Sequence, residues 1–144
     1  MSENARLEEL CKSFSEEPIV NTPVRFDFKL DSLTKGLAVG RMKVTSEMLV
    51  GRVGIVNGSI MDAPANTLGV YAAMSVIPEG HTPRINFSVN NIGKAFAGET
   101  LYIFARVINE NRYSIVVSFS VVGENTGDVK TIGQALYLKP HKTG

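Results

Sequence analysis

One long helical pattern, in residues 56–78, constrains the fold of this chain more than any other feature. From about Ile60 onward, its apolar side chains form two stripes that together cover most of the helix circumference. The first stripe consists of Ile60, Pro64, Thr67, Val70, Met74 and Ile77, and the second of Met61, Ala65, Leu68, Ala72 and Val76. A helix that is apolar on most sides has to be buried inside the domain.

The narrow stripe that remains on this helix holds polar and small residues, namely Asp62, Asn66, Gly69 and Ala73. Residues three and four apart lie on the same face of a helix. The preceding residues 57–59 read Asn-Gly-Ser, and the backbone N–H groups of a helix start can bind an anion or an oxyanion. We therefore expect a functional site at the start of this helix.

Pro64 leaves two positions open for the start of the helix. A proline in a helix interior costs about 3 kcal/mol, whereas a proline in the first turn is tolerated. Either Asp62 caps a helix that has Pro64 in its first turn, or the helix begins at Gly58 and is kinked. The residue pattern is compatible with both alternatives.

Strand patterns flank the helix on both sides. Two precede it and four follow it, in residues 24–30, 37–45, 84–90, 101–108, 114–121 and 130–138. In the second strand the apolar phase shifts at Gly40-Arg41, which predicts a β-bulge there. The short connections after the helix predict that the four following strands are antiparallel neighbours.

A short amphipathic helix is predicted near the N-terminus, in residues 5–14. Its apolar face holds Leu7, Leu10, Cys11 and Phe14. Cys11 is the only cysteine of the chain, and its place on this face predicts a buried structural thiol.

These elements predict an α+β fold in which one antiparallel sheet of about six strands wraps around one long central helix. The N-terminal helix and its connection occupy residues 1–22, the main domain residues 23–140, and a tail residues 141–144. The outer edges of such a sheet invite pairing with another chain. We therefore expect a homo-oligomer.

The composition excludes several functional classes. A formal net charge of +1 gives no electrostatic reason to expect a nucleic acid partner. His81 and His141 are the only histidines, and one cysteine cannot form a metal cluster, so we predict no metal site. No apolar run is long enough to span a membrane, and we do not expect the acidic, polar N-terminus to be a signal peptide. The expected location is cytoplasmic, with a mitochondrial one left open.

The order of elements resembles the hotdog fold, and two motifs add to this resemblance. Residues 57–59 (NGS) followed by residues 66–72 (NTLGVYA) are similar to the central motif of PaaI-type acyl-CoA thioesterases. Residues 96–101 (FAGETL) are similar to the loop that precedes an apolar strand in that family. In the family, His-Gly-Gly opens the central helix and a catalytic aspartate follows at the offset where Asn66 stands here.

The resemblance implies that the backbone N–H of Gly58 polarises a thioester carbonyl, assisted by the helix N-terminus. Asn66 stands where the family's aspartate attacks the carbonyl or activates water, and Asn57 stands for the histidine. An amide cannot accept a proton at neutral pH, and general-base assistance is worth about 10²–10⁴-fold in rate. Asp62, one turn before Asn66, is the candidate for a relocated base, with a helix N-cap as its alternative role.

The candidate substrate contacts are Ser59, Thr67, Thr82 and Arg84. The resemblance implies an acyl-CoA ligand with a fatty or aromatic acyl group, no further cofactor, and a site at the subunit interface of a dimer or a dimer of dimers. Three hypotheses stay open: a thioesterase, a protein that binds acyl-CoA without hydrolysing it, and a dimeric structural module.

Overall fold

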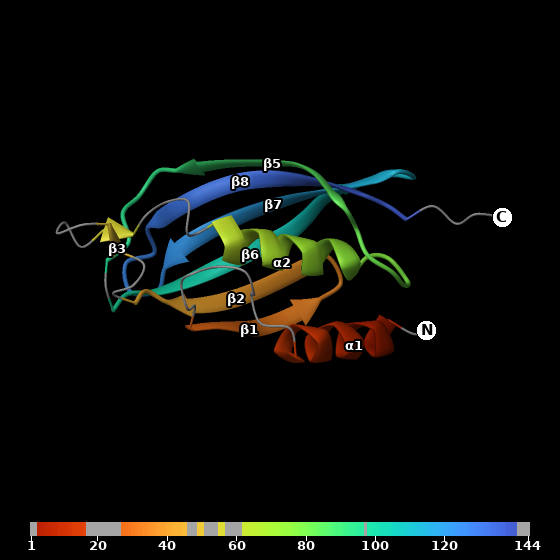
Figure 1. The fold of residues 1–144 in the computed structure, drawn as a ribbon, viewed down its shortest axis with the longest axis horizontal. Helices are drawn as coiled ribbons and strands as arrows, with labels where there is room; N and C mark the ends of the chain where they lie inside the picture. The colour runs from red at the N-terminus through yellow and green to blue at the C-terminus, as the bar shows by residue number, and fades with distance from the viewer. Residues whose placement is uncertain are drawn as a thin grey trace.

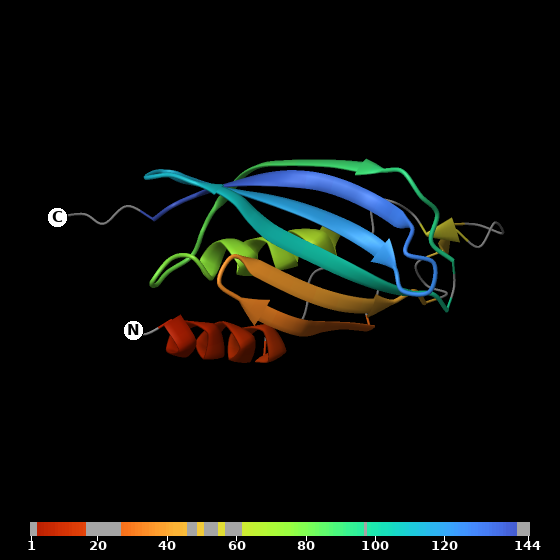
Figure 2. The ribbon, with the colours of Figure 1, turned by 180° about the vertical axis from the view of Figure 1, so that it is seen from behind.

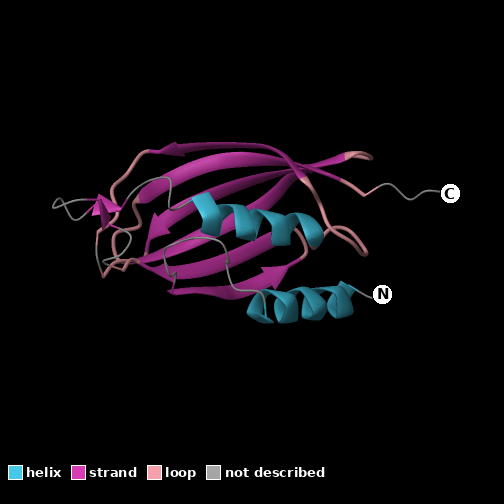
Figure 3. Cartoon of the chain, in the orientation of Figure 1, coloured by secondary structure: helices cyan, strands magenta, loops and turns pink. Residues whose placement is uncertain are grey.

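The computed structural model describes residues 3–16, 27–45, 49–50, 55–56, 62–96 and 98–140 of the chain. Two helices and eight strands are assigned within these ranges (Figures 1 and 3). In chain order they are α1 (Glu3–Glu16), β1 (Asp27–Thr34), β2 (Leu37–Lys43), β3 (Leu49–Val50), β4 (Ile55–Val56), α2 (Asp62–Met74), β5 (Arg84–Asn91), β6 (Thr100–Glu110), β7 (Ser114–Gly123) and β8 (Val129–Leu138).

Six of the strands form one antiparallel sheet in the order β1-β2-β6-β7-β8-β5, and β3 and β4 form a separate pair. The sheet curves around α2, which lies against one of its faces (Figure 1). Seen from behind, the strands lie in front of this helix (Figure 2). The arrangement confirms the predicted α+β hotdog fold. Within the described ranges, neither helix is long and apolar enough to cross a membrane.

The strands after α2 differ in one respect from their predicted order. β6, β7 and β8 are sequential antiparallel neighbours, as expected. β5, however, pairs with β8 at the far edge of the sheet and not with β6. The connection between β5 and β6 spans residues 92–99, which is long enough to pass from one edge of the sheet to its centre.

The predicted bulge at Gly40-Arg41 is wrong. Ala38, Gly40 and Met42 are all buried and therefore share the face of β2 that lies under α2. The irregularity lies instead in β1, between Leu30 and Ser32, in its pairing with β2. The apolar pattern of the strand looked shifted because Gly40 contributes no apolar side chain, although its position faces the core.

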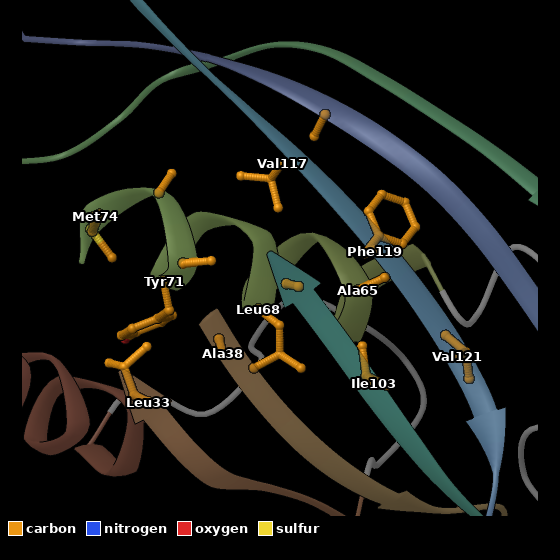
Figure 4. Packing of buried hydrophobic residues seen from close by; sticks show 14 of the residues in the cluster. Leu33, Ala38, Ala65, Leu68, Tyr71, Met74, Ile103, Val117, Phe119 and Val121 are labelled. Carbon is orange, nitrogen blue, oxygen red and sulfur yellow. The ribbon is translucent and has the colours of Figure 1, made fainter. Parts of the chain in front are cut away.

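The central helix is buried, as its two apolar stripes predict. Ala65, Leu68 and Ala72 are fully buried and face the sheet, where Ile103 and Val117 complete the same core (Figure 4). As described, α2 begins at Asp62, and its third residue is Pro64. In a helix that begins here, the missing N–H of Pro64 belongs to the first turn and costs no helix hydrogen bond. Residues 57–61 lie outside the described ones, so both alternatives for the helix start stay predictions.

The N-terminal helix is present, but its buried face differs from the predicted one. Leu10 is buried, whereas Cys11 is exposed. The prediction of a buried thiol is therefore wrong, because Cys11 lies one residue, about 100° of helix rotation, beyond the contact centred on Leu10. The ring of Phe14 packs edge-to-face against the rings of Phe28 of β1 and Tyr71 of α2, at centroid distances of 5.4 and 5.0 Å.

Arg6 connects α1 to the C-terminal end of α2. Its side chain is buried, and its Nε lies 3.3 Å from the carbonyl oxygen of Met74 and 3.2 Å from that of Ile77. Its guanidinium also donates to the carbonyl oxygen of Gly80 at 2.9 Å. The last carbonyls of a helix have no partner within it, and a positive charge there is favourable. Since α2 has no basic residue in its own last turn, α1 supplies the cap.

Replacement of Arg6 by Met is expected to lower the free energy of unfolding by about 2 kcal/mol. The methionine keeps most of the apolar stem but removes hydrogen bonds from a charged donor, which contribute about 1.5–3 kcal/mol. Urea unfolding followed by circular dichroism measures the change. Glu8→Gln, at an exposed position of the same helix, is the control and is expected to stay within about 0.5 kcal/mol of the wild type. Equal midpoints for Arg6→Met and the wild type would contradict the capping role.

Candidate functional site

The centre of the candidate site is a contact between Asn66 of α2 and Tyr137 of β8. The Tyr137 hydroxyl donates to the Asn66 Oδ1 over 3.4 Å. Tyr137 is fully buried, while Asn66 is half-buried. The polar stripe of the central helix therefore faces β8, where a tyrosine side chain meets its amide.

Gly69 makes room for this tyrosine. It lies three residues after Asn66 on the same stripe of α2 and is buried. A Cβ at this position would lie 2.5 Å from the Tyr137 hydroxyl oxygen, closer than real Cβ contacts are found. The absence of a side chain at Gly69 thus allows the phenol to reach Asn66.

Arg84 brings a positive charge to the same region. It begins β5 and lies opposite Tyr137 in the β5–β8 register. Its guanidinium carbon lies 4.8 Å from the ring centroid of Phe87, a cation–π contact that keeps it beside the sheet edge. Burial raises the pKa of the Tyr137 hydroxyl well above its ordinary value, and the charge of Arg84 opposes this rise only in part. The hydroxyl therefore stays protonated and able to donate.

Both threonines that were predicted as site residues are also described. Thr82 is buried, and its Oγ1 has no hydrogen-bond partner among the described residues. It precedes Pro83, whose carbonyl oxygen accepts from the backbone N–H of Leu138 at 2.8 Å. This bond holds the start of β5 against the end of β8. Thr67 is half-buried on α2, next to Asn66 in the chain.

The other predicted site residues are not placed by the structure. Asn57, Gly58 and Ser59 lie outside the described residues. Asp62 is the first residue of α2, but its side chain is outside what is described. The predicted oxyanion donor and relocated base therefore remain predictions. Of the predicted site residues, Asn66 contacts the Tyr137 hydroxyl, and Arg84 lies opposite Tyr137 in the neighbouring strand.

Sequence reasoning missed Tyr137. Its signal was the alternation of the last strand, in which Ala135 and Tyr137 are both buried and face α2. A tyrosine at an inward-facing strand position needs a partner for its hydroxyl. The polar stripe of the helix was the place to look for that partner.

The arrangement offers hydrogen-bond donors to a ligand rather than a base. The Asn66 Oδ1 is engaged by Tyr137, and Arg84 adds a cation. Such a site suits a carbonyl or an anionic oxygen. Among the described residues, no group of three or more His, Cys, Asp or Glu side chains is placed to hold a metal ion.

A separate hollow of about 200 Å³ is lined by Lys29, Arg41, Lys43, Thr100 and Glu124. Arg41 and Lys43 are exposed and alternate with buried residues of β2. They therefore lie on the face of the sheet that points away from α2. The sheet separates this hollow from Asn66.

No family model and no curated protein matches this chain. Among solved structures, it is similar to the E. coli PaaI protein from the phenylacetic acid degradation operon, with 20% sequence identity, 99% of each chain covered and a TM-score of 0.84. It is also similar to zebra fish thioesterase superfamily member 2, with 18% identity, 92% of this chain and 96% of that chain covered, and a TM-score of 0.77. A Streptococcus mutans protein bound to acetyl CoA shares 17% identity over 86% of this chain and 96% of its own, with a TM-score of 0.72. These likenesses show a shared fold.

Proposed function

We propose that this protein is an acyl-CoA thioesterase-like hotdog protein that binds an acyl-CoA thioester beside Asn66. The observation that carries the proposal is the half-buried Asn66 amide, whose oxygen accepts from Tyr137, with Arg84 opposite Tyr137 on the neighbouring strand. The amide can donate to a thioester carbonyl, and the guanidinium can bind an anionic oxygen of the ligand. The Streptococcus mutans protein of the same fold is bound to acetyl CoA, which supports this class of ligand.

The resemblance of the central motif supports the remaining parts of the proposed site. The N–H of Gly58 would polarise the thioester carbonyl, and a second copy of the chain would complete the site across a dimer interface. Ser59, Thr67 and Thr82 would contact the substrate. The proposal requires no metal and no cofactor apart from the coenzyme A thioester itself.

Two activities are candidates at this site. Hydrolysis requires a base, and Asp62, four residues before Asn66, is the residue proposed for it. Binding without hydrolysis is favoured by the amide at position 66, which cannot accept a proton at neutral pH and whose Oδ1 already accepts from Tyr137. An amide whose oxygen already accepts a hydrogen bond stabilises a bound ligand through its N–H groups and does not activate water.

Thermal unfolding in the presence of acyl-CoA thioesters tests the proposal. A ligand that binds only the native state stabilises it by about 2.7 kcal/mol at a concentration of 100 Kd. We expect at least one member of a panel of fatty and aromatic acyl-CoA thioesters to raise the melting temperature. ATP at the same ionic strength controls for nonspecific binding of a charged nucleotide. A panel without any shift would contradict both activities.

Turnover of the same panel separates the two activities. A shift without release of coenzyme A supports the binding protein. A measurable wild-type rate that Asp62→Asn abolishes, with binding unchanged, supports hydrolysis by the relocated base. A wild-type rate that survives Asp62→Asn would contradict the role proposed for Asp62.

A further inference from the structure

We propose that Tyr137 is a positioning residue, which holds the amide oxygen of Asn66 so that Asn66 presents its N–H₂ group to the carbonyl oxygen of a bound thioester. The inference rests on the proposed function for the identity of the ligand. The orientation of the Asn66 amide is its structural half, because it concerns the protein without a ligand. That half depends on the contact between the Tyr137 hydroxyl and the Asn66 Oδ1.

The tyrosine is fixed from three sides. Its backbone pairs with Ile115 of β7 on one side and with Arg84 of β5 on the other. Its side chain is fully buried, and its hydroxyl occupies the space beside Gly69 that a Cβ would fill. A phenol held in this way has little freedom to follow the amide if the amide turns. The position of the Tyr137 hydroxyl therefore determines the orientation of the Asn66 amide.

The direction of the hydrogen bond follows from the chemistry of the two groups. Burial raises the pKa of the Tyr137 hydroxyl, so the phenol carries its proton at neutral pH. An amide oxygen accepts hydrogen bonds, whereas its nitrogen only donates. With the phenolic O–H directed at the Oδ1, the Asn66 Nδ2 and its two protons point away from Tyr137.

This orientation determines what the site can recognise. An Asn66 amide that presents N–H₂ needs an acceptor on the ligand, and a thioester supplies one in its carbonyl oxygen. Arg84 adds a second donor group of positive charge on the same side of the sheet. A ligand group that only donates would meet two donors and bind poorly.

The test uses Tyr137→Phe, which removes the hydroxyl and keeps the ring. In the ligand-free protein, the ¹³C resonance of the Asn66 side-chain carbonyl reports a hydrogen bond to its oxygen, and Asn66→Ser assigns it by its disappearance. We expect this resonance to move upfield in Tyr137→Phe. Tyr71→Phe is the matched control, because Tyr71 is a buried tyrosine whose hydroxyl lies 3.1 Å from the Ser13 Oγ on α1. It is expected to leave the Asn66 resonance in place.

The ligand half is tested with an acyl-CoA thioester labelled with ¹³C at its carbonyl. We expect its bound C=O stretch to lie at higher frequency in Tyr137→Phe than in the wild type, and its affinity to fall about fivefold, as for one neutral hydrogen bond. An Asn66 resonance that responds equally to Tyr71→Phe and Tyr137→Phe, or to neither, would overturn the positioning role. If no acyl-CoA binds, the proposed function and the ligand half fail, while the Asn66 resonance still decides the structural half.

Discussion

Asn66→Asp is expected to raise the rate of acyl-CoA hydrolysis by about 10²–10⁴-fold, the usual contribution of general-base assistance. The substitution replaces a group that cannot accept a proton by one that can. Tyr137 would still donate to one carboxylate oxygen, which leaves the other oxygen free to activate water. The exchange keeps the size of the side chain, so the contact beside Gly69 is retained.

The surroundings of position 66 favour an ionised carboxylate. Hydrogen bonding to the charged form and a nearby positive charge both lower the pKa of a carboxyl group. Tyr137 supplies the hydrogen bond and Arg84 the charge. Desolvation acts in the opposite direction, but Asn66 is only half-buried. We therefore expect the introduced aspartate to be deprotonated, and thus able to act as a base, at neutral pH.

Release of free coenzyme A, followed with a thiol-reactive chromogenic reagent, measures this rate. Cys11 is exposed and would react with the same reagent, so all variants are compared in a Cys11→Ser background. Asn109→Asp is the control, because it adds the same charge at an exposed position of β6. It is expected to leave the rate at the wild-type level. An Asn66→Asp protein that binds acyl-CoA without faster turnover would show that position 66 is not the catalytic one.

The parts of the fold that were predicted correctly are those with a regular burial pattern. In β7, Ile115, Val117, Phe119 and Val121 are buried, and the residues between them are only partly covered. This alternation is visible in the sequence because each of these four inward positions carries a large apolar side chain. The central helix was recognisable for the same reason, since its apolar residues surround most of its axis.

The errors come from positions whose environment is set by another part of the chain. Gly40 faces the core, yet its lack of a side chain made the strand pattern look shifted. The pairing of β5 with β8 depends on which strands meet across the curved sheet, and local turn signals carry no information about it. From the sequence, Arg6 looks like a solvent-exposed charge of α1. Only the folded chain places it beside the carbonyl groups at the end of α2.

The candidate site was predicted in part for a related reason. Asn66 and Arg84 were identified from motif and position, but neither indicates its own partner. Tyr137 is 71 residues from Asn66, and only the folded sheet brings the two together. The alternation of β8 marks Tyr137 as an inward-facing residue, but no local pattern identifies Asn66 as its partner.

Leu68→Ala is expected to lower the free energy of unfolding by about 2–5 kcal/mol, as for other fully buried leucines. Leu68 is fully buried and points from α2 toward β2 and β6 (Figure 4).

Leu68 lies over Gly40, where a Cβ would come within 2.6 Å of the Leu68 Cδ1 and 2.7 Å of the Phe28 Cε2. The helix can sit this close to the sheet because the strand has no side chain beneath the leucine. Gly40→Ala alone is therefore expected to cost about 1–3 kcal/mol through overpacking.

The double variant Gly40→Ala/Leu68→Ala shows whether the two positions share one space. The alanine at position 40 would occupy part of the cavity left by Leu68. The double variant should therefore lose less free energy of unfolding than the two single variants together, by about 0.5–3 kcal/mol. The remaining contact with Phe28 keeps the compensation incomplete. Urea unfolding midpoints with unchanged m-values measure each free energy. Ile115→Ala is the control partner for Gly40→Ala. Gly40 pairs with Ile103, which pairs with Val121, and Val121 lies six residues along β7 from Ile115. The two positions are therefore far apart, and their effects on the free energy of unfolding should add. Additive costs for Gly40→Ala and Leu68→Ala would mean that the glycine does not set how closely α2 approaches the sheet.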